Sequence, residues 1–537
     1  MERTGKPIET PVLIVGAGPV GLALACDLGM RGVPCLLIEQ GDGTIDHPKA
    51  SAINARSMEL MRRWSIADAV REASTPDGFP HTALYCTSLK GFEIARIERP
   101  HHGGRGPTMT SPERAQRCNQ LFLDPILAAR ARSFECVDVR YGWRLESFVQ
   151  DDSGVTAVVQ DLNKHETHTV RPTRLIDCSG GGSIVRRSLG IAMSGSDHVG
   201  YHTTILVRAP ELWRHHDKGR AALISFVDAR GIWRNLILLD SGSLYRLGLR
   251  GKEFYDNPEA VDASAMFRGV VGGDAPHEIV SVRRWTARNV VADAYQVGRV
   301  HLAGDAAHLN HPASGIGLNT GLGDAADLGW KLAAEYNGWA GEHLVESYEA
   351  ERRPVGLRNV GNADATHADD RTRSSHPSIA EDSAEGVRAR EEMGRAIMSR
   401  QKERVITDGL ALGYRYVSPQ IAQEEDTPPQ QDVSTYRSST YPGARAPHAF
   451  LSDGRSTLDL FGTGYVLMNF SAASAAPFTQ AFEAKCVPFK VADIDDPAIA
   501  TLYERQLVLV RPDGHVAWRG NELPADPSVI VDMVRGA

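Results

Sequence analysis

Near the start of the chain, runs of hydrophobic residues are separated by a glycine-rich turn. This pattern predicts a strand, a turn, a helix and a second strand. In VLIVGAGPVGLALACDLGMRGVPCLLIEQ, one apolar run ends at Val15 and another ends at Ile38. Glycines at positions 16, 18 and 21 lead from the first run into an apolar segment of helix length. Together these features predict a complete βαβ unit.

The spacing Gly-x-Gly-x-x-Gly in this unit is typical of a turn that binds a dinucleotide. The first glycine permits the tight turn, the second lets the backbone approach a pyrophosphate, and the third lets helix and strand pack closely. Glu39 is suited to accept hydrogen bonds from a ribose diol and would repel a 2′-phosphate, which favours FAD or NAD over NADP. A turn that only packs a helix on a sheet would explain neither Glu39 nor the spacing. The residues expected to bind the dinucleotide are Gly16, Gly18, Pro19, Val20, Gly21, Glu39 and Gln40.

A second strand-and-turn pattern lies in VHLAGDAAHLNHPASGIGLNTGLGDAADLGWKL, which begins at Val300. The apolar residues up to Ala303 predict a strand, and a helix is expected from about Gly323. A carboxylate at Asp305 is suited to accept from ribitol or ribose hydroxyls, and the helix opening would direct N–H groups at the negative edge of a flavin. This segment therefore favours FAD over NAD. Its expected FAD-binding residues are Gly304, Asp305, Pro312, Gly315, Gly317, Leu318 and Asn319.

The segment after Glu39 departs from the regular βαβ repetition of an NAD-dependent dehydrogenase. DHPKASAINARSMELMRRWSIADAV is a polar loop followed by an amphipathic helix that starts near Arg56. The loop could bring Lys49 or Arg56 near a pyrophosphate, or these residues could form a solvated basic face. The sequence leaves both interpretations open.

The rest of the pattern divides the chain into further units. Strand-like alternation over about 185–280 predicts an antiparallel sheet inserted into the nucleotide-binding domain, where it would cover the reacting ring. The residue pattern from Gly323 to about Ala411 predicts helices. A polar, proline-bearing stretch from 422 predicts a linker. We therefore expect an FAD-binding domain in residues 1–184 and 281–420, a sheet domain in 185–280 with a contribution from 75–110, and a C-terminal domain in 440–537.

Composition narrows the possible partners and location. The chain has 537 residues, 42% hydrophobic and 23% charged, with a formal net charge of -8 and seven dispersed cysteines. This length suggests about three domains, and the charge argues against a nucleic-acid partner. We expect no leader peptide, no membrane span and no metal site, and a cytoplasmic location with reduced thiols. The C-terminal unit holds Cys486 and no CxxC motif, so we expect it to serve in packing or in a homodimer.

The combined motifs resemble those of the FAD-dependent aromatic hydroxylases, the para-hydroxybenzoate hydroxylase-like or class A flavoprotein monooxygenases. The resemblance rests on the glycine turn with Glu39, on GRVHLAGDAAH with GIGLNTGLGDAADLGWKL, and on LIDCSGGGSIVRRSLGI. SPERAQRCNQLFLDPIL is similar to the segment in which the family has a flavin-contacting glutamine, here Gln120. The segments YPGARAPHAFL, STLDLFGTGYVLM and LVLVRPDGHVAWRG resemble the thioredoxin-like domain of the phenol hydroxylase branch and of hydroxylases that tailor polycyclic natural products.

This resemblance implies a fold and a reaction. The fold is α/β, with a Rossmann-like FAD-binding domain of the glutathione reductase type, an inserted antiparallel substrate domain and a thioredoxin-like C-terminal domain. The reaction is hydroxylation of a small phenolic or polycyclic aromatic substrate through a flavin C4a-hydroperoxide, with NADH or NADPH and O2 as co-substrates. The open alternatives are a flavin-fold binding protein without turnover and an NAD-dependent dehydrogenase. A flavin-dependent halogenase would carry Trp-x-Trp-x-Ile-Pro, which is absent.

One motif departs from the family pattern. Where the family usually has Cys-Asp-Gly-Ala-Arg-Ser, this chain has Cys-Ser-Gly-Gly-Gly-Ser from Cys178 to Ser183. Ser179 and Gly182 replace the acid and the arginine, so we expect a mobile loop and weak discrimination between NADH and NADPH. Arg186 and Arg187 would provide any phosphate contact, unless they are plain surface charges.

The sequence does not identify a general base. Pro312 is expected to shape the face of the flavin at which O2 reacts, or to be an ordinary turn proline. Polar residues in suitable regions are candidates for catalysis, although a single His or Tyr near an apolar strand is more often structural. These candidates are Pro312, His308, Arg234 and Tyr245, followed by His311, Tyr201 and Arg288.

Overall fold

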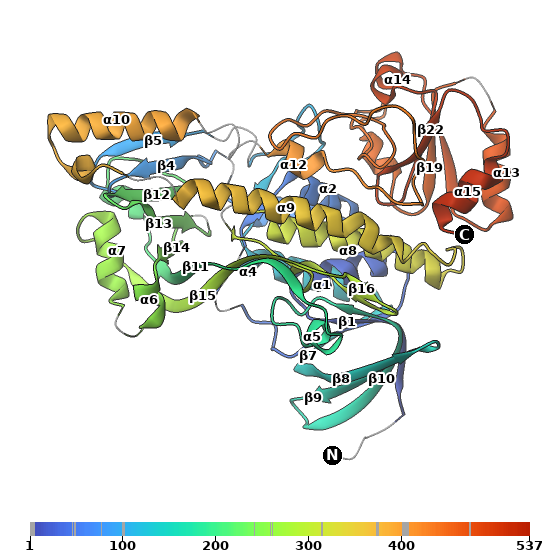
Figure 1. Cartoon of the computed structure of the whole chain (residues 1–537), viewed down its shortest axis with the longest axis horizontal. Coiled ribbons are helices and arrows are strands. Elements are labelled where there is room, and N and C mark those ends of the chain that lie inside the picture. The colour runs from blue at the N-terminus through green and yellow to red at the C-terminus, as the bar shows by residue number, and fades with distance from the viewer. Residues whose placement is uncertain are drawn as a thin grey trace.

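The computed structural model describes residues 6–45, 47, 50–76, 78–98, 103–240, 242–257, 259, 261–312, 315–371, 375–399, 407–471 and 474–537. It consists of three units (Figure 1). A central unit contains a mostly parallel sheet, a second unit contains an antiparallel sheet, and the C-terminal unit lies on the other side of the central one.

The central sheet is built around the predicted βαβ unit. Its strands pair in the order β16-β17-β10-β1-β2-β7. They span Gln296–Val297 (β16), Val300–Leu302 (β17), Glu166–Asp177 (β10), Ile8–Val15 (β1), Cys35–Glu39 (β2) and Val137–Tyr141 (β7). Helix α1 (Pro19–Met30) connects the parallel strands β1 and β2, as the apolar runs predict. Strands β8 (Trp143–Asp151) and β9 (Gly154–Asp161) add an antiparallel extension to β10.

The helices around this sheet come from distant parts of the sequence. They are α2 (Ala55–Arg63), α3 (Ala67–Ala73), α4 (Gln120–Arg132), α5 (Ile184–Ser188), α8 (Gly317–Tyr336), α9 (Ser347–Arg371) and α12 (Asp408–Leu412). A small ribbon of β3 (Ala52–Ile53) and β6 (Gln116–Arg117) lies beside them. The amphipathic helix expected after the polar loop is α2. The second predicted helix begins at Gly317 rather than near Gly323, because the glycines at 321 and 323 are accommodated inside it.

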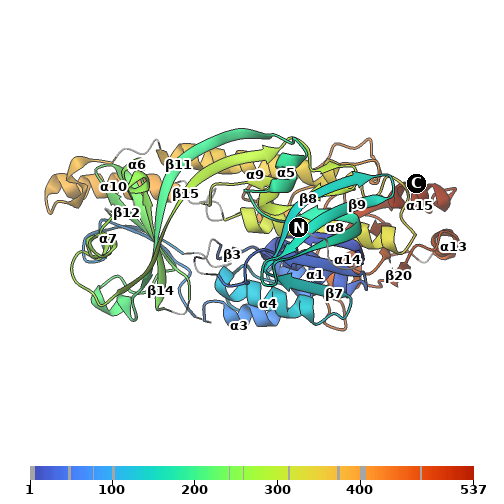
Figure 2. The ribbon, with the colours of Figure 1, turned by 90° about the horizontal axis from the view of Figure 1, so that it is seen from below.

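The second sheet is antiparallel except between β12 and β4. Its order is β18-β15-β11-β14-β13-β12-β4-β5. The strands are β18 (His308–Leu309), β15 (Glu278–Ala292), β11 (Met193–Arg208), β14 (Leu244–Arg250), β13 (Gly231–Leu238), β12 (Leu223–Asp228), β4 (Ala83–Cys86) and β5 (Glu93–Ile97). The long strands β11 and β15 run from the central unit into this sheet (Figure 2).

Helices cover the two faces of the second sheet unequally. One face packs on α7 (Ala263–Val271) through a core that includes Phe267 and Leu247, with α6 (Lys252–Asp256) nearby. On the other face, α10 (Ala384–Ser399) covers the part near β4 and β5. The remainder of that face is turned toward the central unit.

The C-terminal unit has the βαβαββα order expected of a thioredoxin-like domain. Its elements are β19 (Tyr465–Asn469), α13 (Ala476–Ala484), β20 (Phe489–Asp493), α14 (Pro497–Tyr503), β21 (Leu507–Val510), β22 (Val516–Gly520) and α15 (Pro527–Arg535). The strands pair in the order β20-β19-β21-β22, with β19 and β20 parallel. Short 3-10 turns at Leu212–His215, Gly304–Ala306, Pro377–Ala380 and Thr457–Leu460 complete the chain's regular structure in the described ranges.

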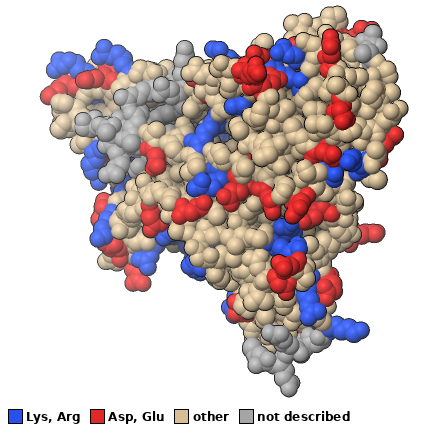
Figure 3. All heavy atoms as spheres, turned by 45° about the vertical axis from the view of Figure 1, so that its right-hand side comes forward, with Lys and Arg blue, Asp and Glu red and all other residues tan. Residues whose placement is uncertain are grey.

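The surface carries intermixed charges. On the face drawn in Figure 3, acidic and basic side chains are interspersed rather than gathered into one large basic area. Across the residues that the structure describes, no helix has both the length and the apolar character needed to cross a membrane. In the same part of the chain, no group of three or more His, Cys, Asp or Glu side chains could hold a metal ion.

Candidate active site

The carboxyl ends of four parallel strands lie at one edge of the central sheet. The register pairs Val15 of β1 with Ile38 of β2 and with Asp177 of β10, and Asp177 with Leu302 of β17. The segments that follow these strands therefore meet at the same edge. Open α/β sheets bind their ligands at such an edge.

The glycine turn after β1 has no room for larger residues at two of its three glycines. Gly16 has a φ of +104°, and a Cβ there would lie 2.5 Å from the carbonyl oxygen of Cys178. A Cβ on Gly21 would lie 2.0 Å from the carbonyl oxygen of Gly16. The turn, the first helix and the end of β10 are thus packed backbone against backbone.

Gly18 differs from these two glycines because it faces open space. A Cβ there would meet no atom within 4 Å. Gly18 is also the N-cap of α1, where no side chain accepts the helix's first N–H groups and Pro19 occupies the first turn. An uncapped helix N-terminus beside open space fits a pyrophosphate, in both shape and charge.

Glu39 ends β2 next to the glycine turn. Its Oε2 accepts the N–H of Ala17 at 3.0 Å, and its Oε1 accepts the N–H of Gly41 at 2.8 Å. These bonds place a carboxylate at the position where the sequence predicts ribose recognition. Gln40, the next residue, is exposed.

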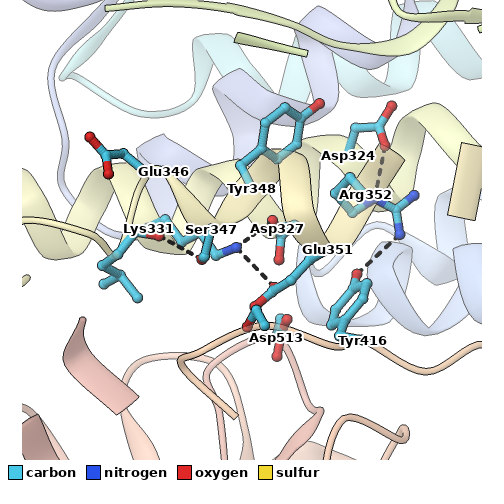
Figure 4. Close-up of polar contacts among 12 residues, drawn as sticks. Asp324, Asp327, Lys331, Glu346, Ser347, Tyr348, Glu351, Arg352, Tyr416 and Asp513 are labelled. Atoms are coloured by element: carbon cyan, nitrogen blue, oxygen red, sulfur yellow. Dashed lines mark hydrogen bonds and ion pairs between the residues drawn. The ribbon is translucent and has the colours of Figure 1, made fainter. Parts of the chain in front are cut away.

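The turn after β17 carries Asp305 at the same edge. Gly304 has a φ of +60°, and a Cβ there would lie 2.9 Å from Cγ2 of Val20 on α1. Val20 thus packs the turn against α1, while Asp305 is exposed. The N–H of Gly304 donates to Asp324 of α8 at 3.0 Å. The sequence did not point to Asp324, whose contact with Arg352 is shown in Figure 4.

Helix α8 begins beside this turn with an uncapped N-terminus. Its N-cap, Ile316, has no side-chain hydrogen bond, and Gly317 faces open space. Leu318 packs against the core of the central unit. Asn319 uses its amide within the protein: it accepts from the N–H of Asn54 and donates to the carbonyls of Ala52 and Gly315. It links α8 to the β3 ribbon instead of pointing a free amide at the flavin.

Three other predicted contacts, at Arg56, Lys49 and Gln120, lie apart from the glycine turn or outside the described residues. Arg56 is buried, and its guanidinium donates to Glu59 and to the carbonyl of Asp513. The structure thus gives this charge a role at the C-terminal unit, and we leave it out of the proposed FAD site. Lys49 falls outside the described residues. Gln120 begins α4 and donates to Asp124 at 3.1 Å.

The divergent loop after β10 is held by an acid that sequence reasoning overlooked. Asp177 is fully buried and accepts from the N–H and Oγ of Ser179 and from Oγ of Ser183. Burial raises the pKa of Asp177, while these hydrogen bonds counteract the shift. Three bonds to one carboxylate connect the loop to the end of β10, and the expected mobility of the loop stays a prediction. Ser183 also caps α5.

The two arginines after this loop bond to the local backbone. Arg186 donates to the carbonyl of Ile191 at 3.1 Å, and Arg187 donates to the carbonyl of Gly182 at 2.7 Å. Ser179 and Gly182 are exposed. The outer surface of the loop is therefore made of neutral groups.

The free part of the antiparallel sheet faces the central unit. Because side chains alternate along a strand, Leu206, Arg246 and Ser281, which pair across β11, β14 and β15, share one face. Leu206 packs with Leu121 of α4. The ring of His47 hydrogen-bonds with Ser281 at 3.0 Å and with Thr204 at 2.7 Å. These contacts identify the face as the wall opposite the nucleotide-binding edge.

Two catalytic candidates lie on the opposite face of this sheet. Arg234 contacts the carbonyl and sulfur of Met266 on α7. Tyr245 belongs to the core under α7, where burial raises its pKa to about 12. Neither side chain reaches the wall that faces the central unit, since strand alternation directs both toward α7.

The remaining candidates have varied environments. His308 is fully buried and bonds to Asp324 at 2.7 Å. The ring of His311 lies 5.3 Å from that of His202 on the inner wall, and Pro312 is exposed beside it. Tyr201 packs on Tyr255, and Arg288 pairs with Asp197 at 3.5 Å on the surface. Of these candidates, His308 bonds directly to α8, and His311 lies against the inner wall of the antiparallel sheet.

The edge as a whole fits FAD. It offers an open, uncapped helix start for a pyrophosphate, carboxylates at Glu39 and Asp305 for sugar hydroxyls, and a second uncapped helix start at Gly317. When bound, FAD supplies the redox chemistry by which a monooxygenase activates O2. The residues at this edge would bind and orient the cofactor.

Comparisons with known proteins agree with this geometry. A family model described as an FAD binding domain matches residues 9–363, and one described as aromatic-ring hydroxylase, C-terminal, matches residues 439–534. The 4-methyl-5-nitrocatechol 5-monooxygenase of Burkholderia sp. is 33% identical, over 99% of this chain and 98% of that protein. Tetracenomycin B2 monooxygenase-dioxygenase of Streptomyces olivaceus is also 33% identical, over 98% of each chain.

A solved structure extends the similarity to three dimensions. The structure of RebC soaked with chromopyrrolic acid, with bound 7-carboxy-K252c, has a TM-score of 0.92 and 39% identity, over 99% of this chain and 100% of that chain. The matches span the nucleotide-binding domain, the antiparallel sheet and the C-terminal unit together. The chain therefore belongs to the FAD-dependent aromatic-ring hydroxylases, the class A flavoprotein monooxygenases.

Proposed function

We propose that this hydroxylase inserts one atom of O2 into a phenolic or polycyclic aromatic ring, with FAD as cofactor and NADH or NADPH as reductant. The second oxygen atom leaves as water, and the nicotinamide nucleotide supplies the two electrons. The relatives named for reactions on a nitrocatechol and on tetracenomycin B2 support an aromatic substrate. The observation that carries the proposal is the shared edge at which Gly18, Glu39, Asp305 and Gly317 meet.

The substrate is proposed to lie between the opening of α8 and the inner wall of the antiparallel sheet. Leu206 and Leu244 are buried apolar residues of that wall, and the hydroxyls of Thr204 and Ser281 hydrogen-bond with His47, contacts that a substrate would have to replace. Such a wall would hold an aromatic ring and exclude water from the reaction. It would also bind oxygen-bearing groups on that ring.

Arg246 adds a specific hypothesis about the substrate. It lies on the inner wall, opposite Leu206 in the strand register, and burial lowers its pKa to about 10. A buried guanidinium favours an acidic or carbonyl-bearing group. The ligand of the RebC structure carries a carboxy group in its name, which is consistent with an acidic aromatic substrate here.

The cofactor assignment is tested by replacing two glycines in the same turn. Gly18→Val should leave the stability of the apoprotein unchanged, because a Cβ there meets no protein atom, but it should abolish FAD retention. Gly21→Val should destabilise the apoprotein, because a Cβ there overlaps the carbonyl of Gly16. Absorption bands at about 375 and 450 nm report bound flavin. Full flavin occupancy in Gly18→Val would contradict the pyrophosphate position.

Turnover is tested by measuring NADH and NADPH oxidation with and without phenolic compounds. Stimulation by the aromatic compound, with formation of a hydroxylated product, is expected of a hydroxylase. Bound FAD without any stimulation across a panel of phenols would favour the binding protein. Because Arg186 and Arg187 bond to local carbonyls, we expect less than about tenfold discrimination between the two nucleotides, or 1.4 kcal/mol. A hundredfold preference would reveal a dedicated 2′-phosphate pocket.

The location and oligomeric state of the protein stay predictions. We propose a cytoplasmic enzyme, on the basis of seven cysteines without a disulfide-like spacing. A homodimer is the expected assembly if the C-terminal unit has a role in association. Sedimentation of the purified holoenzyme would distinguish a dimer from a monomer.

A further inference from the structure

A buried carboxylate links the two segments that are proposed to hold the sugar and ring ends of FAD. Asp324 lies inside α8, two turns after Gly317, and its side chain is fully buried. Its Oδ2 accepts the N–H of Gly304 at 3.0 Å and bonds to Nε2 of His308 at 2.7 Å. Both partners belong to the segment that carries Asp305.

The other oxygen of Asp324 continues this connection into α9. Oδ1 accepts Nε of Arg352 at 2.8 Å, and Arg352 also donates to the carbonyl of Thr320 and to Oη of Tyr416 (Figure 4). Burial alone would raise the pKa of Asp324, but His308 and Arg352 lower it below its usual value. The carboxylate is thus ionised and accepts three N–H donors.

We propose that Asp324 is a positioning residue for FAD, which sets the Gly304–Asp305 turn against the N-terminus of α8. Through Gly304 it determines where the Asp305 carboxylate stands, and through its own helix it determines where the N–H groups near Gly317 point. The two groups would then bind one FAD molecule in a single geometry. This inference rests on the proposed FAD site.

The same helix provides a matched control one turn further on. Asp327 is also fully buried on α8, but its partners are Lys331 at 2.8 Å and Arg511 at 3.1 Å. Figure 4 shows this second cluster beside the first, on the side of Glu351 and Asp513. Asp327 therefore shares with Asp324 full burial and cationic partners, without a bond to the Gly304 turn.

The experiment compares Asp324→Asn with Asp327→Asn in the full chain. Asparagine has one acceptor oxygen where aspartate has two, so at least one of the three donors at position 324 loses its partner. We expect Asp324→Asn to raise the FAD dissociation constant at least tenfold and to alter the visible circular dichroism of the bound flavin. Asp327→Asn should change the dissociation constant less than threefold. Titration of apoprotein with FAD and the thermal midpoint of apoprotein are the two measurements.

The outcomes separate positioning from general stability. Equal losses of FAD affinity in the two variants, or wild-type affinity in Asp324→Asn, would overturn the proposal. If Asp324→Asn gives no soluble protein, His308→Leu removes one of its partners, and we expect at least a threefold rise in the dissociation constant. Wild-type affinity in that variant would also overturn it. Failure of the wild-type chain to bind FAD would instead refute the proposed function.

Discussion

The FAD-binding domain meets its two neighbours through boundaries of different chemistry. Toward the C-terminal unit, buried ion pairs lie beside an apolar core that includes Trp330 and Tyr465. Arg445 pairs with Glu59, and Arg511 pairs with Glu351 and Asp327. Toward the antiparallel sheet, the contacts include imidazole-hydroxyl hydrogen bonds of His47 and the aliphatic packing of Leu121. The fully buried ion pairs of the first boundary thus differ from these neutral contacts at the second.

This difference in contact chemistry indicates how easily each boundary can open. A buried ion pair is costly to break, because each partner would be left as an unpaired buried charge. Buried ion pairs therefore hold the C-terminal unit firmly against the FAD-binding domain. Neutral contacts can be exchanged for contacts with a ligand at lower cost. The sheet boundary is the better place for a substrate to enter and leave.

The largest expected effect is at the charged boundary. Arg511→Met leaves Glu351 and Asp513 buried near a side chain without charge, and breaking a buried pair costs about 3 to 5 kcal/mol. We expect a clear fall in the thermal and urea midpoints of the apoprotein. The control, Arg455→Met, removes an exposed pair with Asp453 and should leave the midpoints unchanged. Equal midpoints for the two variants would remove the contrast between the boundaries.

An intermediate effect is expected at the sheet boundary, on ligand binding. Arg246 and Arg234 lie on opposite faces of the sheet, and burial lowers the pKa of each to about 10. Arg246→Met should raise the KM or dissociation constant of the aromatic substrate about tenfold or more, the loss expected for a hydrogen bond to a charged group. FAD affinity should not change. Arg234→Met should leave substrate binding intact, since that side chain contacts α7.

The opposite result would also be informative. If Arg234→Met alone impaired substrate binding, the inner and outer faces of the sheet would have been assigned in reverse. If both variants only lowered stability, Arg246 would have a structural role like that of the charges at the C-terminal boundary. A substrate titration at saturating FAD distinguishes these cases.

The sequence predicted the strands and turns at the proposed FAD edge because its signals are local. The βαβ unit, the glycine turn and the Gly304–Asp305 turn each depend on residues a few positions apart, and backbone sterics at Gly16 and Gly304 require glycine. The α/β class and the thioredoxin-like order of the C-terminal unit follow from strand and helix patterns. The start of α8 was misplaced because interior glycines normally argue against a helix.

The missed features depend on contacts between distant segments. Arg56 was considered for a pyrophosphate, yet its partner Asp513 lies 457 residues away. Asp324 and Arg352 belong to different helices, and no local motif links them. The positions of Arg234 and Tyr245 also required the sheet register, because a shift of one residue moves a side chain to the other face. Asp177 was overlooked because the family motif places its acid two positions later.

The smallest expected effect concerns Asp124 on α4, the helix whose Leu121 packs against the sheet. Burial raises the pKa of Asp124 to about 7, with Gln120 opposing the shift. Its Oδ1 is buried and has no hydrogen-bond partner among the described residues. Here the folded state binds a proton more tightly than the unfolded state, so this group reduces stability as the pH rises from about 4 to about 7. By contrast, Glu351 and Asp327 at the boundary with the C-terminal unit pair with Arg511.

Asp124→Asn should therefore stabilise the apoprotein at pH 8 and have much less effect near pH 4, where the carboxyl is protonated in the folded state and about half protonated in the unfolded state. The matched control is Asp240→Asn. Burial raises the pKa of Asp240, but the hydrogen bonds from Leu244, Ser243 and Gly242 together lower it below its usual value. Removing this carboxylate should therefore destabilise the protein at pH 8. Urea midpoints of both variants at the two pH values measure the opposite signs. Destabilisation by Asp124→Asn at pH 8 would mean that its carboxylate has a cationic partner, and the two boundaries would then be more alike than the structure indicates.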